Sequence, residues 1–145
     1  MRAMNNPIWM YEACKLLGIR ETPGKRATRA IIELWRTLGK RWVRSDEIHW
    51  CAVTVGACLE RSGYSSTRSA RARSYLDYGM PLDEPVFGCI VVFWRGSPHG
   101  KKGHVGFYLR TDRDKIWVLG GNQANSMCAK PYPASRVLGF RYPLY

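Results

Sequence analysis

The sequence predicts an α+β fold, with helices in the first half of the chain and a mostly antiparallel β-sheet in the second half. Residues 7–79 carry apolar side chains at helical spacing, whereas residues 88–142 contain short runs rich in Val, Ile, Phe, Tyr and Trp. A chain of 145 residues has the usual size of one domain. Residues 1–145 are therefore expected to form a single domain around one core.

The first half of the chain is predicted to contain four helices. Each has apolar residues at helical spacing and ends near a glycine, which favours the left-handed backbone that often follows a helix. The predicted helices are Pro7–Leu17, the segment from Ala27 to Leu38, the segment between Glu47 and Gly63, and the segment between Thr67 and Gly79.

The second half is predicted to contain four strands, because β-branched and aromatic residues dominate its short apolar runs. These runs are Cys89–Trp94, His104–Arg110, Lys115–Asn122 and Val137–Tyr142. The polar residues 111–114 form a turn, so the second and third strands are expected to pair as an antiparallel hairpin. Helices followed by paired strands are typical of the α+β class.

The chain is strongly basic, with a formal net charge of +12. A field of this sign attracts polyanions such as nucleic acid, lipopolysaccharide or the carboxylate-rich bacterial cell wall. Basic residues are spread along the chain, apart from a cluster at Arg68, Arg71 and Arg73, and do not form the basic tail of many nucleic-acid-binding proteins. The charge therefore predicts a class of partner and no particular reaction.

The cysteine count and the hydropathy of the sequence indicate the redox state and the cellular location to expect. Five cysteines are an odd number without a C-x-x-C pair, so reduced thiols are expected, with no metal and no other cofactor. Residues 1–6 lack a basic-then-apolar signal pattern, and no run approaches about 18 apolar residues. We therefore expect a soluble monomer that is synthesised in the cytoplasm without a signal peptide.

Cys51 is a candidate nucleophile because it lies near the N-terminus of the third predicted helix. Free backbone N–H groups and the positive end of the helix dipole stabilise a thiolate there, and also the oxyanion that forms when the thiolate attacks a carbonyl. The commoner role of a free cysteine is that of a small buried apolar side chain. Cys51 taken alone fits either role.

His104 is a candidate base for Cys51, because it opens a predicted strand directly after Gly103, and a glycine allows another segment to approach closely. A purely structural histidine is the alternative. His99 in the preceding loop and His49, two residues before Cys51, compete for the same role. His99 lies on a poorly constrained segment, and His49 is too near Cys51 in sequence for ordinary geometry.

The register of the hairpin supplies a candidate third residue. Folding about its turn places residues whose numbers sum to about 225 opposite each other, so His104 faces Gly121 or Asn122. In either case Asn122 is expected to accept the second ring N–H of His104 and to orient the imidazole. Gln123 is expected to point to the other face of the sheet. Together with the cysteine, these residues fit a Cys-His-Asn arrangement.

Three sequence motifs resemble those of bacterial and phage NlpC and CHAP-like cysteine peptidases. They are Trp50-Cys51-Ala52, Gly103-His104-Val105-Gly106-Phe107 and Leu119-Gly120-Gly121-Asn122-Gln123. The resemblance also includes Pro7-Ile8-Trp9-Met10, Glu21-Thr22-Pro23-Gly24 and Val137-Leu138-Gly139-Phe140-Arg141, in the same order along the chain. The members that it resembles most are small phage-encoded enzymes.

The resemblance implies a papain-like α+β fold and hydrolysis of amide bonds in bacterial peptidoglycan through a thioester acyl-enzyme. It maps the catalytic residues onto Cys51, His104 and Asn122. The chain departs from the family pattern at His49, where a proline or a small residue is expected. Substrate contacts are expected from the remaining candidates, which are Trp50, Asp46, Gln123 and His49.

The leading hypothesis is a phage endolysin-like amidase or endopeptidase that acts in the periplasm or on the cell wall, with lipopolysaccharide as a further anionic partner. An interbacterial effector amidase has the same chemistry and a cognate immunity protein. The alternative from another class is a basic nucleic-acid-binding module without catalysis, which predicts binding that survives loss of Cys51. No specific nucleic acid is expected as a partner of the hydrolase.

Overall fold

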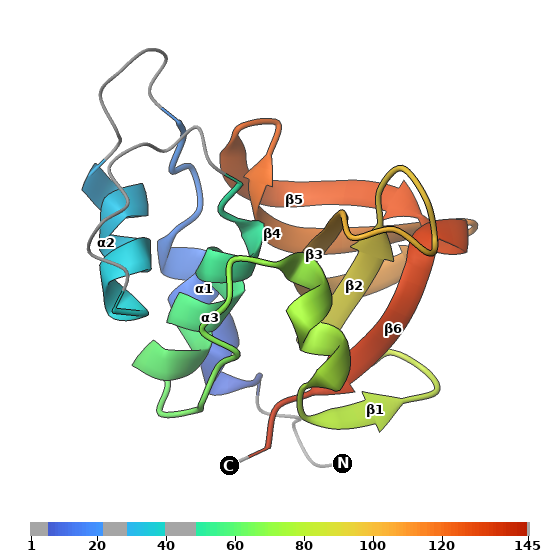
Figure 1. Cartoon of the computed structure of the whole chain (residues 1–145), viewed down its shortest axis with the longest axis horizontal. Coiled ribbons are helices and arrows are strands. Elements are labelled where there is room, and N and C mark those ends of the chain that lie inside the picture. Colours follow the sequence, from blue (N-terminus) through green and yellow to red (C-terminus); the bar gives the residue numbers. More distant parts are fainter. Residues whose placement is uncertain (1–5, 22–28, 40–48, 145) are drawn as a thin grey trace.

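The computed structural model describes residues 6–21, 29–39 and 49–144. Within these ranges three α-helices lie beside a six-stranded sheet (Figure 1). The helices are α1 (Ile8–Lys15), α2 (Arg29–Thr37) and α3 (Cys51–Arg61). No described helix combines the length and the apolar content needed to cross a membrane. The order of helices first and antiparallel sheet second confirms the predicted α+β class.

The sheet has the strand order β1-β6-β2-β3-β4-β5, and every neighbouring pair is antiparallel. Its strands are β1 (Met80–Leu82), β2 (Ile90–Trp94), β3 (Gly103–Asp112), β4 (Lys115–Gln123), β5 (Ser126–Pro133) and β6 (Val137–Tyr142). The sequence did not indicate β1 and β5. Both are edge strands that contain proline, which lacks the N–H of a central strand and hides the strand pattern.

The predicted helix between Thr67 and Gly79 was wrong, because only Ala72–Asp77 is helical, as the short 3-10 helix η1. Hydroxyl groups of serine or threonine two residues earlier accept the backbone N–H groups of Arg68, Ser69 and Arg71 at 3.0 to 3.3 Å. Such local bonds compete with the hydrogen bonds of a helix. The segment before η1 is therefore irregular.

The third helix is central to the core. Its residues from Cys51 to Leu59 are all buried. It packs against α1 and α2 on one side and against β3 and β4 on the other, so it lies between the outer helices and the sheet (Figure 1). Trp9 of α1 donates its indole N–H to the carbonyl of Gly88, just before β2, at 2.7 Å. This bond ties α1 to the segment that leads into β2.

The other face of the sheet buries a second, smaller apolar cluster. Its members alternate along their strands with the residues that face α3, because successive side chains of a strand point to opposite faces. They are Cys89, Val91, Phe93, Tyr108, Ile116 and Val118.

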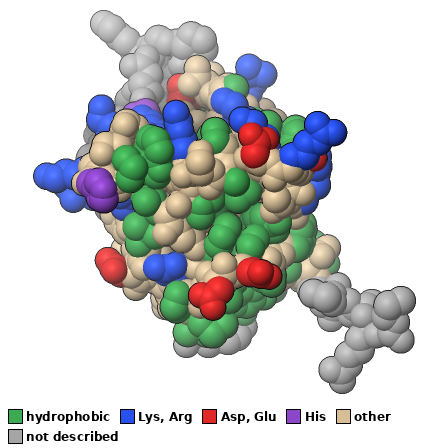
Figure 2. All heavy atoms as spheres, turned by 90° about the vertical axis from the view of Figure 1, so that its right-hand side faces the viewer, with side chains coloured by type: hydrophobic (Ala, Val, Ile, Leu, Met, Phe, Trp, Pro, Cys, Tyr) green, Lys and Arg blue, Asp and Glu red, His purple; other side chains and the backbone are tan. Residues whose placement is uncertain are grey.

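Figure 2 views the molecule from the side away from α2, where apolar side chains reach the surface and Lys and Arg outnumber acidic residues in the upper half.

Gly121 in β4 packs closely against Trp50 and Thr54 at the start of α3. A Cβ at this position would lie 2.6 Å from the ring of Trp50 and would also collide with the hydroxyl of Thr54. We expect Gly121→Ala to lower the free energy of unfolding by about 1–3 kcal/mol, measured by chemical denaturation. Gly100→Ala is the control, because the nearest atom to its added Cβ lies at 3.6 Å. Equal stability of the two variants would contradict this packing.

Candidate active site

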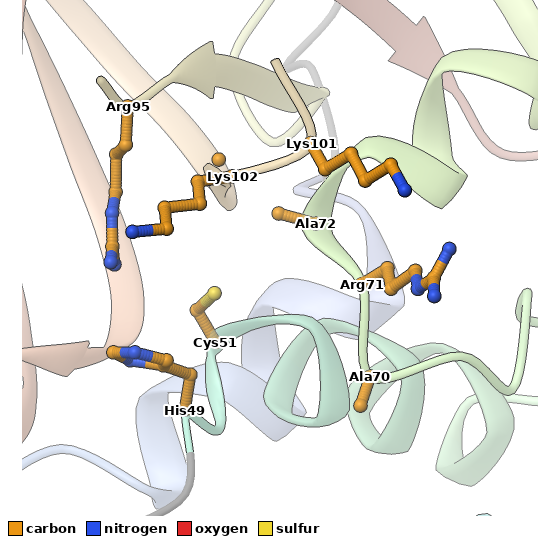
Figure 3. A pocket seen from close by; sticks show the side chains of 9 residues that line it. His49, Cys51, Ala70, Arg71, Ala72, Arg95, Lys101 and Lys102 are labelled. Carbon is orange, nitrogen blue, oxygen red and sulfur yellow. The ribbon is translucent and has the colours of Figure 1, made fainter. Parts of the chain in front are cut away.

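Cys51 is the first residue of α3, and Figure 3 shows its side chain pointing into a pocket of about 280 Å³. The residue is only 3% exposed. Both the backbone N–H and the hydroxyl of Thr54 donate to the carbonyl of Trp50, at 3.0 and 2.7 Å, and so close the first turn of the helix. The thiol is therefore fixed at a helix N-terminus that opens onto a cavity.

The thiol of Cys51 is protonated at rest, because burial raises its pKa above the usual range. The backbone N–H groups of Val105 and Ala52 oppose this shift, and so does the charge of Arg95. These groups stabilise a thiolate once it forms, but burial has the larger effect. Cys51 consequently needs a neighbouring base to become a nucleophile.

His104 is the second residue of β3 and is 4% exposed. Its ring stacks on Tyr132 of β5, with centroids 4.8 Å apart and planes at 25°, and is also near-parallel to Phe93 of β2 at 6.4 Å. Aromatic neighbours from two different strands leave the imidazole little rotational freedom. The imidazole of the predicted base is thus held in a fixed orientation, close to the loop between β2 and β3.

Gln123 at the end of β4 is the hydrogen-bond partner of His104. The Nε2 atom of His104 lies 2.9 Å from the side-chain oxygen of Gln123. The side-chain amide of Gln123 donates to the carbonyls of Val118 and Cys128, at 3.1 and 2.6 Å, so its oxygen must face the histidine. Because this oxygen can only accept, Nε2 of His104 carries the proton and Nδ1 presents a lone pair.

Cys51 and the strand that carries His104 are brought together where α3 packs against β3. The backbone N–H of Val105, the residue after His104, acts on the Cys51 thiol. Among the hydrogen bonds of the described residues there is none between the Cys51 thiol and the His104 ring. Since Nε2 is bound to Gln123, Nδ1 is the ring atom available to receive the thiol proton, and catalytic bonds of this kind commonly tighten only in the substrate complex.

The pKa of His104 is lowered to about 4, chiefly by burial. The hydrogen bond to Gln123 opposes this shift, while the charges of Arg95, Lys130 and His49 add to it. His104 is therefore neutral at neutral pH, which is the state of a general base. The helix N-terminus was expected to stabilise a thiolate at Cys51, but burial has the larger effect on the pKa of this thiol.

The structure contradicts the predicted contact between Asn122 and His104. The side-chain amide of Asn122 instead lies 2.9 Å from Nδ1 of His49, at the surface. Asn122 has a φ of +56°, and the pairing of β4 with β5 is irregular between Gly120 and Gln123. One residue in the left-handed conformation interrupts the alternation of the strand, as in a β-bulge. Gln123 therefore takes the face that a regular strand would give to Asn122.

The turn after β4 also contains residues with a left-handed backbone. Ala124 and Asn125 both have positive φ values, of 49° and 59°, between the paired residues Gln123 and Ser126. Two consecutive left-handed residues form the tight turn that matches the twist of a β-hairpin. The Asn-rich segment that follows Gly120 and Gly121 was the available sequence indication of both the bulge and the turn.

The predicted substrate-binding residues have different surroundings. Trp50 is fully buried and donates its indole N–H to Glu21 at 2.8 Å, so its predicted contact with substrate was wrong and it belongs to the core. Gln123 is buried against His104. His49 is exposed and lines the pocket over Cys51 (Figure 3). Asp46 lies outside the described residues.

The remaining lining of the pocket is basic, and the sequence analysis did not predict that these residues surround Cys51. It comes from the segment before η1, from the end of β2 and from the loop that leads to β3. The lining residues other than His49 and Cys51 are Ala70, Arg71, Ala72, Arg95, Lys101, Lys102 and Gly103. The adjacent lysines at 101 and 102 were the available indication, but their position beside Cys51 depends on the fold.

The site offers little to a metal ion. Across the described residues no group of three or more His, Cys, Asp or Glu side chains is placed to hold a metal. All five cysteines are free thiols. The chemistry that the arrangement can perform is nucleophilic attack by sulfur, with a neutral imidazole as base and an amide oxygen as the group that orients it.

Comparisons with known proteins agree with the fold. No family model and no curated protein matches the sequence. A crystal structure of a protein similar to a lipoprotein of the NLP/P60 family, from Staphylococcus aureus, matches with a TM-score of 0.54 at 16% identity. The match covers 95% of this chain and 41% of that chain, so this chain spans less than half of the other's length. The chain therefore has the papain-like α+β fold of an NLP/P60-family structure.

Proposed function

We propose that the protein is a cysteine hydrolase that cleaves amide bonds of bacterial peptidoglycan, as an endolysin-like amidase or endopeptidase. The observation that carries the proposal is the buried hydrogen bond between His104 and Gln123 beside the helix N-terminus that presents Cys51. This bond selects the tautomer in which Nδ1 is basic.

In the first half of the proposed reaction, Nδ1 of His104 takes the thiol proton as the sulfur of Cys51 bonds to the carbonyl carbon. The electron pair of the C=O bond moves to oxygen, which the backbone N–H groups at the start of α3 stabilise. The tetrahedral intermediate collapses, the C–N bond breaks, and the imidazolium gives its proton to the leaving amine nitrogen. The product is a thioester on Cys51.

In the second half, His104 takes a proton from water while the water oxygen bonds to the thioester carbon. The C–S bond then breaks, the carboxylic acid product leaves, and the sulfur regains the proton held by His104. Gln123 touches neither substrate nor sulfur in this scheme. It is a positioning residue, because it keeps Nε2 protonated through both halves.

Peptidoglycan is the proposed substrate because three features support it. The motifs around Cys51 and His104 resemble wall-cleaving enzymes, the fold is that of an NLP/P60-family structure, and the chain has a net charge of +12. A basic protein concentrates on the anionic wall or on lipopolysaccharide. We therefore also propose that it acts at the wall after synthesis in the host cytoplasm.

The nucleic-acid-binding alternative gains no support from the arginine cluster. Arg68 forms an ion pair with Glu60 at 2.8 Å. Arg73 donates to the carbonyls of Ser97, Pro98 and Lys102 at 2.7 to 2.9 Å. Two of the three arginines are thus engaged within the molecule, so the cluster is not a free row of phosphate-binding groups.

The proposal is tested by incubating the protein with purified peptidoglycan and identifying released muropeptides by mass spectrometry, which also shows the bond that is cut. We expect an alkylating reagent to stop release and a chelator to leave it unchanged. A Cys14→Ala background removes an exposed thiol that would otherwise react as well. Loss of activity in chelator with recovery on added metal would contradict the mechanism.

The lowered pKa of His104 predicts an unusual pH profile. Because the base is neutral above about pH 4, we expect the acidic limb of kcat/KM to lie closer to 4 than to the 6.5 of an ordinary histidine. Circular dichroism at each pH is the control, since a buried neutral histidine also loses folding stability as pH falls below about 6.5. A limb near 6.5 in protein that stays folded would contradict this role of His104.

A further inference from the structure

The pocket over Cys51 shares part of its lining with a second pocket. The pocket over the thiol, of about 280 Å³, and a second pocket of about 360 Å³ are both lined by Arg71 and Lys101. The second also contains Arg73, Ser74 and Gly100, so it extends from the first along the segment that begins η1. The two pockets are therefore adjoining parts of one groove that starts at Cys51. We call it the cationic groove.

The charge of the cationic groove has a single sign. The pocket over Cys51 is lined by Arg71, Arg95, Lys101 and Lys102, and no Asp or Glu belongs to the lining of either pocket among the residues described. Figure 3 shows Arg95 and Lys102 on one side of the thiol and Arg71 with Lys101 on the other. Repelling cations gathered around a cavity are stabilised when an anion enters it.

Arg73 holds the groove in shape and is not free to bind a ligand. Its guanidinium donates to the carbonyls of Ser97, Pro98 and Lys102, which pins the loop between β2 and β3 against η1. Lys101 belongs to this loop. The bonds of Arg73 thus hold the loop that places Lys101 on the same side of the thiol as Arg71 before any ligand arrives, which lowers the ordering cost of binding.

Arg71 and Lys101 have the properties of ligand-binding cations. Both side chains are exposed, and neither forms an ion pair with an acidic group of the described residues. Arg95 lies nearer the chemistry, because its charge acts on both Cys51 and His104. The groove therefore has two cations, Arg95 and Lys102, on one side of the thiol and the exposed pair Arg71 and Lys101 on the other.

We infer that the cationic groove binds a carboxylate-bearing segment of the substrate, and that Arg71 and Lys101 determine specificity for it. The inference rests on the proposed function, since it concerns how the substrate of Cys51 is selected. The planar fork of arginine matches a carboxylate with two parallel hydrogen bonds, and the flexible lysine adds a second charge. A substrate without carboxylates on this side gains nothing from the groove.

The test compares soluble muropeptides with the same muropeptides after their carboxylates have been converted to carboxamides. We expect wild type to have a kcat/KM about tenfold lower for the amidated form, mainly through KM, which corresponds to about 1.4 kcal/mol. Arg71→Gln combined with Lys101→Gln should raise KM for the carboxylated form and abolish the preference. Retained preference in this double variant, or equal cleavage of both forms by wild type, overturns the inference.

The matched control removes the same charge elsewhere. Arg113→Asn combined with Lys115→Gln changes two exposed cations at the turn between β3 and β4, and asparagine suits the positive φ of 57° at residue 113. This variant should keep the full preference for carboxylated muropeptides. A preference lost equally in both double variants would show a general effect of net charge, and would overturn the assignment to Arg71 and Lys101.

A binding measurement separates this inference from the proposed function. Calorimetry with Cys51→Ala protein should detect tighter binding of carboxylated than of amidated muropeptides, whether or not wild type cleaves them. If wild type releases nothing from peptidoglycan, the proposed function fails, and the binding preference alone decides the inference. A competition experiment compares an oligonucleotide with a glutamate-rich peptide of equal charge as displacers of the bound muropeptide. Stronger displacement by the oligonucleotide would assign the groove to phosphates and overturn the inference.

Discussion

Cys51→Ala is expected to reduce release of muropeptides to the background of the assay, a loss of at least about 10⁴-fold in kcat. The thiol forms the covalent bond to the substrate in the proposed reaction, and no other group in the pocket can replace it. The substitution removes only one sulfur from the buried start of α3, so the protein should remain folded. Turnover is measured on purified peptidoglycan, with folding checked by circular dichroism.

Cys58→Ala is the matched control for this loss. Cys58 belongs to the same helix and is also fully buried, but burial raises its pKa to about 12 and it lines neither pocket beside Cys51. Its removal should cost about 1 kcal/mol of packing and leave kcat within a factor of about 2. Near-wild-type turnover of Cys51→Ala, or loss of turnover only in Cys58→Ala, would disprove Cys51 as the nucleophile.

Gln123→Met is expected to lower kcat by about 10- to 1000-fold, which is a barrier increase of about 1.4 to 4 kcal/mol. Methionine has a similar volume and lacks the oxygen that accepts the Nε2 proton of His104. Without that acceptor the imidazole is free to adopt the wrong tautomer or angle. Because Gln123 acts through His104, KM should change little, and Cys51 should still react with an alkylating reagent.

Two further measurements distinguish positioning from a merely structural role. The hydrogen bond to Gln123 raises the pKa of His104, so its removal should move the acidic limb of the pH profile further down. Asn122→Gly is the control, because glycine accepts the left-handed backbone of residue 122 while the amide is removed. We expect a loss of less than about tenfold from this variant, since Asn122 contacts His49 and not His104.

The opposite result in the Asn122 and Gln123 variants would assign the positioning role to Asn122. A large loss of kcat in Asn122→Gly, together with normal turnover and an unchanged pH profile in Gln123→Met, would return the third role to Asn122. It would also mean that the end of β4 rearranges when substrate binds, because His104 and Asn122 do not contact each other in the structure through a hydrogen bond. Chemical denaturation of both variants is needed to exclude a simple loss of stability.

Local patterns in the sequence predicted most of the fold. Apolar residues at helical spacing placed the first three helices close to their positions, and β-branched runs placed β2, β3, β4 and β6. The short helix η1 was overestimated, because hydroxyl side chains capture the N–H groups before it. The edge strands β1 and β5 were missed, because proline conceals strands that need no N–H on their outer side.

The sequence by itself determined that the chain is α+β, that it is strongly basic, and that Cys51 lies at the start of a helix while His104 lies at the start of a strand. These properties depend on composition and on short periodic patterns, which need no knowledge of distant contacts. The side-chain partner of His104 was not determined in this way. A single left-handed residue at position 122 reverses which side chain faces the histidine, and strand alternation alone cannot reveal it.

Only the tertiary structure decided what surrounds the thiol. The cationic groove is built from Arg71 before η1, Arg95 directly after β2 and Lys101 in the same loop, which are brought together by strand pairing and by the bonds of Arg73. Burial decided the protonation states of Cys51 and His104 in the same way. Electric fields and desolvation depend on distance in space, so residues far apart in the sequence set the chemistry of the site.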